Sequence, residues 1–309
     1  MDERALRRVK LSDLRLLRAV VDAGGMAKAG SQFHISQSAV SKAITTLEKT
    51  LGVRLLDRTP KGIFPTPYGE VLLNGAIAVF DELRQSINQI EFLSDPNIGE
   101  LRFAAGEHLL DNFVPAVIAR LHRSYPRMRL RLIQVNTLQQ QHHELRERNI
   151  ELVIDRISQA EPEPDVNVEI LFDDPVFAAA GVNSSWARRR RVTLPDLMGA
   201  LWALPPTYII IGSHLIEAFQ NHGLELPQHV ICHSLQVQKA LVATGCYLAM
   251  LPHCMLELGS ERRSFKKLVK LSKRPAPVGI ITLKNRTPHP LAKLFIQSAR
   301  EVANSLKAP

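Results

Sequence analysis

The segment SQSAVSKAITTLEKTLG, residues 36–52, has hydrogen-bonding side chains at its front and no acidic side chain before Glu48. Apolar residues recur in it at steps of four, three and four, which predicts a helix that buries Val40, Ile44, Leu47 and Leu51. The first two turns of its exposed face then carry Gln37, Ser38, Ser41 and Lys42. Short hydroxyl groups, an amide and an ammonium group can hydrogen-bond to base edges and phosphates, whereas phosphate repels acidic side chains. We therefore predict that this helix enters the major groove of double-stranded DNA.

Two shorter predicted helices precede this one. Apolar spacing from Leu11 predicts a helix with Ser12 as its N-cap and Gly24–Gly25 as its end. A second helix is predicted over residues 26–33, and Ser36 is expected to cap the third, which ends at Gly52. Three short helices joined by tight turns form a helix-turn-helix, whose last helix presents its N-terminal residues to the groove.

Residues 55–94 continue this unit. The segment LLDRTPKGIFPTPYG predicts a β-hairpin wing, because Pro65 and Pro67 exclude a helix, and Arg58 and Lys61 are placed to reach phosphates or a minor groove. Residues 68–94 then predict a long helix with a coiled-coil seam of Ala76, Phe80, Leu83, Ile87 and Ile90. Pairing with a second copy predicts a dimer that reads a two-fold symmetric site. The alternative is a long helix that packs on its own chain.

Composition narrows the function class. The 309 residues carry a net charge of +9, and the first 66 hold 12 Lys+Arg against 6 Asp+Glu, which suggests an anionic partner at that end. No apolar run is long enough to span a membrane, and the charged N-terminus lacks an export signal, so a cytoplasmic protein is expected. Three cysteines without CxxC spacing argue against a disulfide framework or structural zinc. No Walker A, GxSxG or HExxH motif indicates enzyme chemistry.

Beyond the turn-forming residues 94–99, strands and helices alternate. Strands are predicted at ELRFAAG, MRLRLIQV and IELVIDR, with helices over 109–125, closing before Pro126, and over 137–149. After a Pro-rich crossing at 159–165, strands are predicted at VEILF, PVFAAAG, HVICHS and CYLAMLP, with helices near 213–222 and 235–244. A last strand, PVGIITLK, and a terminal helix over 289–306 are expected to return to the first layer. This pattern is typical of open α/β layers.

The chain resembles LysR-type transcriptional regulators along essentially its whole length. Residues 14–69 match the family's helix-turn-helix and wing nearly position for position, and GELRFAAG, SYPRMRLRL and LVATGCYLAMLP add support. The resemblance implies a multidomain α/β protein: a winged helix-turn-helix over 1–67, a dimerising linker helix over 68–95, and a two-lobed α/β effector domain like periplasmic binding proteins over 96–309. Lobe I would comprise 99–165 plus about 268–309, and lobe II about 166–267.

The resemblance also implies partners. The protein would be a regulator and not an enzyme, without cofactor or metal, that binds an interrupted inverted repeat as a homodimer or homotetramer. A small-molecule effector would modulate it, and RNA polymerase would be a further partner if it activates. The effector, the operator, the direction of regulation and the redox activity of Cys232, Cys246 and Cys254 are not predicted.

Site residues follow from the resemblance one position at a time. The DNA contacts it implies are Ser36, Gln37, Ser38, Ser41, Lys42, Thr45, Arg58 and Lys61. Ser38 stands where many members have proline. Asp57 stands where phenylalanine is usual, and we expect it to pair with Arg54 or Arg58 instead of contacting the duplex.

A ligand cleft is expected between the lobes. Its implied lining residues are Glu107, His108, Asn136, Thr137, Asp155, Arg156, Thr207 and Ser234. Helix N-termini that converge there would favour an anionic metabolite, because their free N–H groups point into the cleft. Glu107 and His108, however, stand where the family often keeps a small hydroxyl residue, which favours an effector with hydrogen-bond donors or positive character.

Other clusters have plainer interpretations. His142 and His143 point about 100° apart on a helix and cannot both face one metal. The cysteines are expected to be structural, and Arg188–Arg191 to form a solvated loop. Two alternatives stay open: a two-lobed solute-binding or catalytic domain whose N-terminal bundle contacts proteins, and an architectural DNA-binding protein without a ligand.

Overall fold

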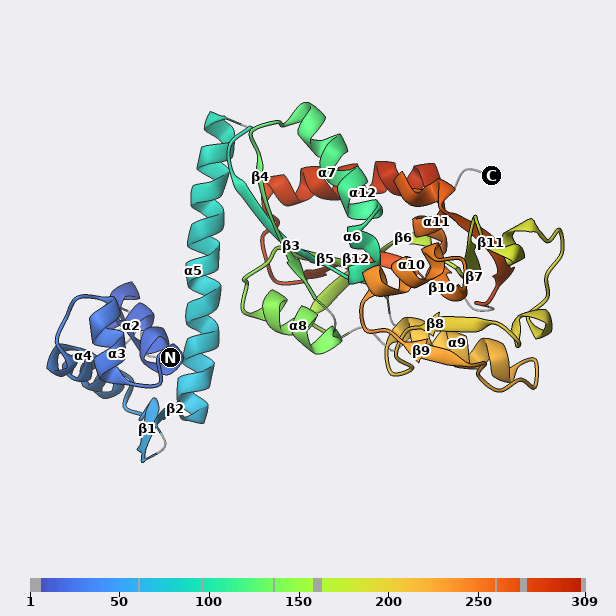
Figure 1. Ribbon diagram of the computed structural model, residues 1–309. Coiled ribbons are helices and arrows are strands. Elements are labelled where there is room, and N and C mark those ends of the chain that lie inside the picture. Colours follow the sequence, from blue (N-terminus) through green and yellow to red (C-terminus); the bar gives the residue numbers. More distant parts are fainter. Residues whose placement is uncertain are drawn as a thin grey trace. The chain divides into compact units, whose positions relative to one another are not determined.

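The computed structural model describes residues 7–60, 62–95, 97–135, 137–157, 163–258, 260–272 and 277–306. The chain divides into two compact units, residues 1–86 and 87–309, and helix α5 belongs to both (Figure 1). Within the described ranges, no helix combines the length and apolar character needed to cross a membrane. The predicted winged helix-turn-helix and two-sheet α/β domain are confirmed.

The N-terminal unit contains the three predicted helices and the wing. Its elements are α2 (Leu11–Asp22), α3 (Met26–Gln32), α4 (Gln37–Leu51), β1 (Leu56–Thr59), β2 (Gly62–Pro65) and the first part of α5 (Pro67–Ser94). The N-cap prediction for the first helix is wrong. Lys10 holds that position, because its carbonyl accepts from the Asp13 and Leu14 N–H groups and Ser12 already lies in the first turn.

Helix α4 forms as its sequence predicts. The Ser36 hydroxyl caps it by accepting from the Ala39 N–H at 3.2 Å, and Gly52 ends it in the left-handed conformation at φ 72°. Val40, Ile44 and Leu47 are buried in a core shared with α2 and α3. Gly30 permits the tight turn before α4, because a Cβ there would lie 2.7 Å from the Ile35 carbonyl oxygen.

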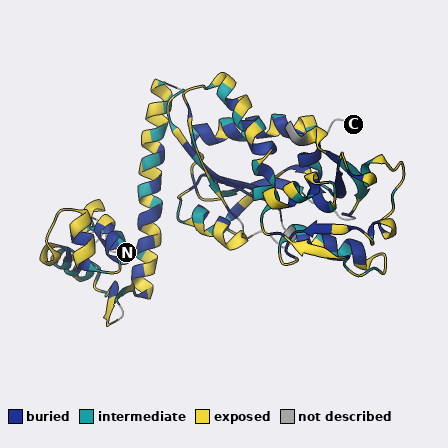
Figure 2. Ribbon diagram, in the orientation of Figure 1, coloured by how far each residue is buried: buried dark blue, intermediate teal, exposed yellow. Residues whose placement is uncertain are grey.

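Helix α5 changes character along its length. Ala76 is buried, and the Arg15 guanidinium lies 5.5 Å from the centre of the Phe80 ring, so the first two seam positions face their own unit. Leu83, Ile87 and Ile90 are 47%, 49% and 65% exposed, which leaves the later seam positions open to a partner (Figure 2).

The first sheet of the second unit has strand order β4-β3-β5-β12-β6. Its strands are β3 (Glu100–Ala105), β4 (Arg129–Gln134), β5 (Leu152–Arg156), β6 (Val166–Asp173) and β12 (Pro277–Leu283). Helices α7 (Phe113–Ser124) and α12 (Pro290–Leu306) pack on one face with Phe103, and α8 (Leu138–Arg146) on the other with Ala104 and Val153. The short α6 (Glu107–Leu110) precedes α7; one helix was predicted, and Asn112 divides it by capping Phe113.

The second sheet has strand order β11-β7-β10-β8-β9. Its elements are β7 (Val176–Gly181), β8 (Leu201–Leu204), β9 (His229–Ile231), β10 (Tyr247–Pro252), β11 (Phe265–Lys270), α9 (Ile210–Gln220), α10 (Leu235–Ala243), α11 (His253–Glu257) and the 3-10 turns Ser185–Arg188, Pro195–Leu197 and Ser260–Arg263. Helix α9 covers one face through Leu215 and Phe219, and α10 and α11 cover the other through Val242 and Met255.

Sheet membership differs from the predicted lobe limits in one respect. The limit at residue 166 places the whole of β6 in lobe II, yet β6 is the edge strand of the first sheet, because β12 pairs antiparallel with both β5 and β6. The chain therefore passes to the second sheet after Asp173. Strands β8 and β11 were not predicted.

Candidate functional site

The front of α4 is an open surface. Gln37, Ser38 and Lys42 are exposed, and Ser41 and Thr45 are half-buried. Ser36 has a structural task, because its hydroxyl caps the helix and lies 2.9 Å from the Ser38 hydroxyl. The surface thus offers hydroxyl, amide and ammonium groups without a carboxylate, which is the chemistry that base edges and phosphates accept.

The wing is tied to the same helix. One Oε1 atom of Glu48 in α4 accepts from the N–H groups of Leu55 and Leu56, at 2.8 and 3.3 Å. The exposed Arg58 guanidinium donates to the Ser41 hydroxyl at 3.4 Å. The wing's arginine and the helix front therefore form one continuous surface.

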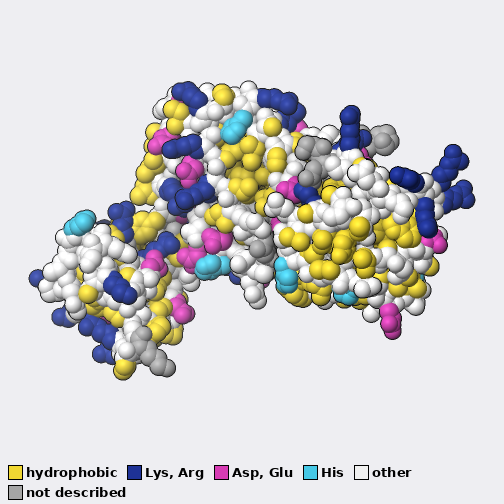
Figure 3. Space-filling view, in the orientation of Figure 1, with side chains coloured by type: hydrophobic (Ala, Val, Ile, Leu, Met, Phe, Trp, Pro, Cys, Tyr) yellow, Lys and Arg dark blue, Asp and Glu magenta, His cyan; other side chains and the backbone are white. Residues whose placement is uncertain are grey.

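Two wing expectations have different outcomes. Lys61 lies outside the described residues. The expected pairing of Asp57 is wrong within the described part of the chain: β1 leaves its carboxylate exposed, and Arg58 reaches Ser41 instead. Basic side chains nevertheless stand out along the edge of this unit in the space-filling view (Figure 3).

A cavity of about 460 Å³ lies in the second unit, lined by residues from both sheets and their loops. The lining residues are Gly106, Glu107, His108, Val135, Thr137, Leu138, Gln139, Gln141, Asp155, Arg156, Pro205, Pro206, Tyr208, Ile209, Ile211, Cys232, His233, Leu235, Gln238, Met250 and Pro252. Its volume is that of a pocket for a metabolite-sized ligand.

Five predicted effector residues come together in this lining: Glu107, His108, Thr137, Asp155 and Arg156. Thr207 and Ser234 are not among the lining residues; their neighbours Tyr208 and His233 are. Asn136 lies outside the described residues.

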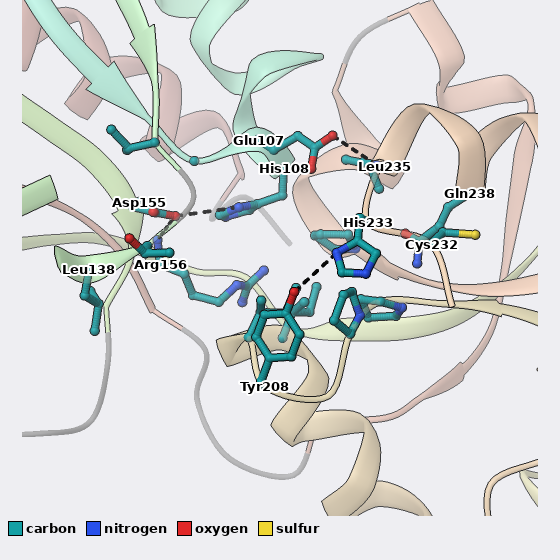
Figure 4. A pocket seen from close by; sticks show the side chains of 18 of the residues that line it. Glu107, His108, Leu138, Asp155, Arg156, Tyr208, Cys232, His233, Leu235 and Gln238 are labelled. Atoms are coloured by element: carbon teal, nitrogen blue, oxygen red, sulfur yellow. Dashed lines mark hydrogen bonds and ion pairs between the residues drawn. The ribbon is translucent and has the colours of Figure 1, made fainter. Parts of the chain in front are cut away.

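Sequence reasoning missed Tyr208, His233 and Gln141, although the first two adjoin predicted positions. The Tyr208 hydroxyl lies 3.2 Å from Nδ1 of His233, and both point toward the cavity (Figure 4). Gln141 lies on α8, four residues after Thr137, and helical spacing from that residue is the signal that could have found it.

Asp155 lies at the end of β5, deep in the cavity wall. It accepts from the Arg156 N–H at 2.7 Å and from the Gln141 side chain, and Nδ1 of His108 is 3.7 Å from its Oδ1 atom. Burial raises the pKa of Asp155 to about 6, against the opposing effect of these hydrogen bonds and of Arg156. Burial and the positive charge of Arg156 hold the pKa of His108 well below its usual value, so its ring is neutral.

The charged end of Arg156 is engaged by the protein itself. Its terminal nitrogens donate to the carbonyl and carboxylate oxygens of Asp174, both at 2.8 Å, and the two side chains are 3% and 0% exposed. Asp174 lies between β6 and β7, and its other carboxylate oxygen accepts from the Cys254 N–H. The pair therefore fastens the crossing between the sheets.

Two further bonds join the lobes across the cavity's edge. Oε1 of Glu107, at the start of α6, accepts from the Leu235 N–H at the start of α10, at 3.0 Å. Lys239 on α10 pairs with Asp111 at 2.7 Å. These two polar contacts thus join α6 and the residue that follows it to α10.

Comparison with known protein families identifies the family of this chain. The model of the LysR substrate binding domain matches residues 94–304, and that of the bacterial regulatory helix-turn-helix protein, lysR family, matches residues 11–70. The chain belongs to the LysR family. This LysR protein is accordingly a transcriptional regulator with a DNA-binding helix-turn-helix and an effector-binding domain.

Three relatives illustrate the kinship of this LysR regulator. An SDS degradation transcriptional activation protein of Pseudomonas sp. is 30% identical, over 92% of this chain and 94% of that protein. A hydrogen peroxide-inducible genes activator of Pectobacterium carotovorum is 28% identical over 97% of each. Full-length OxyR from Pseudomonas aeruginosa has the same fold, with a TM-score of 0.66, 21% identity and 96% and 97% coverage.

Each of the two matched regions contains one of the two sites of the LysR regulator. Helix α4 and the wing fall inside the helix-turn-helix match, and the cavity falls inside the substrate-binding match. Among the residues the structure describes, no group of His, Cys, Asp or Glu side chains is arranged to hold a metal ion. Burial raises the pKa of the thiols of Cys232 and Cys254, which disfavours their reactive thiolate forms.

Proposed function

We propose that this regulator binds an interrupted inverted repeat through α4 and the wing, as a homodimer or a dimer of dimers, and that a small molecule in the cavity alters how it holds DNA. The observation that carries the proposal is the acid-free front of α4 joined to Arg58 of the wing. It acts without catalysis, in the cytoplasm where its operator lies, and contacts RNA polymerase if it activates.

The DNA contacts in this proposal are Ser36, Gln37, Ser38, Ser41, Lys42, Thr45, Arg58 and Lys61. Helix α5 supports the dimer, because Leu83, Ile87 and Ile90 form an exposed apolar row that a second copy can cover. Gel shifts with the DNA that adjoins the protein's own coding region test the proposal directly. Failure to bind that DNA at low salt, while the chain is folded, would favour the two-lobed solute-binding or catalytic alternative.

Replacing Gln37 with alanine is expected to relax specificity at one operator position. Loss of a base-edge contact costs about 1–3 kcal/mol of discrimination, which is roughly 5- to 150-fold in relative affinity. Competition gel shifts with single-base operator variants measure this ratio. Ser31→Ala is the matched control, because Ser31 is exposed on α3 and its hydroxyl donates to the Ala27 carbonyl of the same helix. Unchanged base preferences in the Gln37→Ala variant would contradict the major-groove assignment.

Replacing Arg58 with alanine should weaken binding to all sequences nearly equally. The guanidinium is placed to meet phosphate, so its loss removes about one released counterion and lowers the slope of log affinity against log salt by about 0.9. Affinity titrations from 50 to 200 mM salt measure the slope. Arg123→Ala, an exposed arginine of the second unit, should leave it unchanged. An Arg58→Ala slope equal to the wild-type slope counts against a wing–phosphate contact.

A further inference from the structure

Among the described residues that line the cavity, the protein leaves no lysine or arginine side chain unengaged. Among the described residues that line it, Arg156 carries the one permanently charged cation, and both of its terminal nitrogens are bonded to Asp174. His108 is neutral, because burial and Arg156 disfavour its protonated form. A carboxylate, sulfate or phosphate in this cavity would therefore meet no unengaged cationic side chain.

Two helix N-termini at the cavity are also occupied. A helix N-terminus attracts anions through its unpaired N–H groups. At α10, the carboxylate of Glu107 already accepts from the Leu235 N–H, and at α8 the Thr137 hydroxyl accepts from the Gln140 N–H at 3.2 Å. At each of these two N-termini, an oxygen atom of the protein thus already accepts from an N–H group that an anionic ligand could use. Helix α9 begins without a side-chain cap, and an anionic probe tests that end.

Hydrogen-bond acceptors of the cavity wall, in contrast, remain available to a ligand. Gln141 is 2% exposed and donates to Asp155, while its Oε1 atom has no hydrogen-bond partner among the residues that the structure describes. Nε2 of His108 also has none, and a proton on Nδ1, which faces Asp155, makes Nε2 an acceptor. A carboxylate accepts about four hydrogen bonds, and Asp155 receives two from Arg156 and Gln141. Buried acceptors without donors cost free energy that a donor-bearing ligand would recover.

We propose that the cavity binds a small organic cation with N–H donors, a primary ammonium or an amidinium, carried on an apolar body. This inference rests on the proposed function, since it names the ligand class of the same cavity. The cationic group lies against Asp155 and the oxygen of Gln141. The apolar body contacts the opposite wall, where the lining includes Pro205, Ile209, Ile211 and Met250. The positive charge of the ligand then stabilises the ionised form of Asp155, which burial disfavours.

The test is a thermal melt of the full-length chain with a matched probe series. Both tryptophans, Trp186 and Trp202, lie in the second unit, so tryptophan fluorescence reports the melting of the domain that holds the cavity. The six-carbon series is hexylammonium, 1-hexanol, hexanoate and hexyl sulfate, the last representing the alkyl sulfate named in the Pseudomonas relative. Benzamidinium and benzoate form an aromatic pair.

Hexylammonium or benzamidinium is expected to raise the midpoint by roughly 5–10 °C at 100 times its Kd, and the neutral and anionic probes by less than 1 °C. A larger rise with hexanoate, hexyl sulfate, benzoate or hexanol, or no rise with either cation, would overturn the proposal. Neither result bears on the DNA binding in the proposed function, which the gel shifts test separately.

Two variants localise the site. Asp155→Asn and Gln141→Leu should each weaken hexylammonium binding at least tenfold in the same melts. Asp196→Asn is the matched control, because that exposed carboxylate lies outside the cavity lining and accepts from the N–H and hydroxyl groups of Thr193. Each variant's own midpoint without ligand is recorded first, so a folding defect is separated from lost binding. If both cavity variants bound hexylammonium as tightly as the wild type does, the cation would bind elsewhere and the proposed site would be wrong.

Discussion

Replacing Arg156 with alanine is expected to lower the free energy of unfolding of the second unit by about 3–5 kcal/mol. The loss is large because the Asp174 side chain is fully buried and would lose its ion-pair partner. Asp174 also anchors the Cys254 N–H, so the damage extends to α11. Urea unfolding followed by tryptophan fluorescence measures the change.

An exposed arginine provides the control for this loss. Arg127 pairs with Asp95 at the surface, where its side chain is 62% exposed, and Arg127→Ala should cost no more than about 1 kcal/mol. The double variant Arg156→Met with Asp174→Asn should recover part of the stability, since neither member of this buried pair is then charged. A loss for Arg156→Ala no larger than that for Arg127→Ala would mean that the Asp174 charge is satisfied in another way.

Replacing Asp155 with asparagine is expected to stabilise the chain above pH 6. The pKa of Asp155 is about 6 in the folded chain against 3.8 without burial, so the folded state binds the proton more tightly than the unfolded state. Its contribution to stability is therefore full below pH 4 and is lost as the pH rises to 6. That difference corresponds to about 3 kcal/mol, which uncharged asparagine avoids. Gln141 can turn its amide so that Oε1 accepts from the new Nδ2 group.

Unfolding free energies between pH 4 and pH 8 measure this effect. The gain of Asp155→Asn over wild type should be small at pH 4, grow through pH 5 and level off above pH 6. Asp95 is expected to show the opposite effect on stability. The Asn97 N–H and Arg127 lower its pKa, so Asp95→Asn should reduce the free energy of unfolding at neutral pH. A gain for Asp155→Asn that does not vary with pH would show that titration of this carboxyl is not its source.

The two effects together suggest why the cavity keeps a costly acid. Destabilising residues at binding sites are commonly retained for function. Asp155 lies against Gly106, where a Cβ would come within 2.1 Å of its Oδ1 atom. The absence of a side chain at Gly106 therefore leaves room for the carboxylate. A cationic ligand that meets Asp155 turns this cost into binding energy, and binding should weaken as the pH falls through 6.

The DNA-binding unit could be predicted from the sequence because its signals are local. The cap at Ser36, the stop at Gly52 and the spacing of Val40, Ile44 and Leu47 all act within one helix. The wing was equally readable, since its turn and prolines lie within fifteen residues. Even here the partner of Arg58 was not foreseen, because Ser41 lies 17 positions away.

The effector domain shows where local signals end. The alternation of apolar residues predicts that β6 is a strand, but only its pairing with β12, more than a hundred residues later, places it in the first sheet. The short strand β8 has too few residues for a periodic signal, and its parallel partners β9 and β10 define it.

The sequence by itself determined a winged helix-turn-helix with a short polar third helix and a two-lobed α/β domain, because dihedral preferences, caps and periodicity act over a few residues. The tertiary structure alone decided which groups the cavity offers. Arg156 was expected to meet the ligand, yet Asp174 neutralises it, and the cavity is left with Asp155 and the free oxygen of Gln141. The net charge of a site depends on which residues neutralise one another, and that depends on contacts between distant segments.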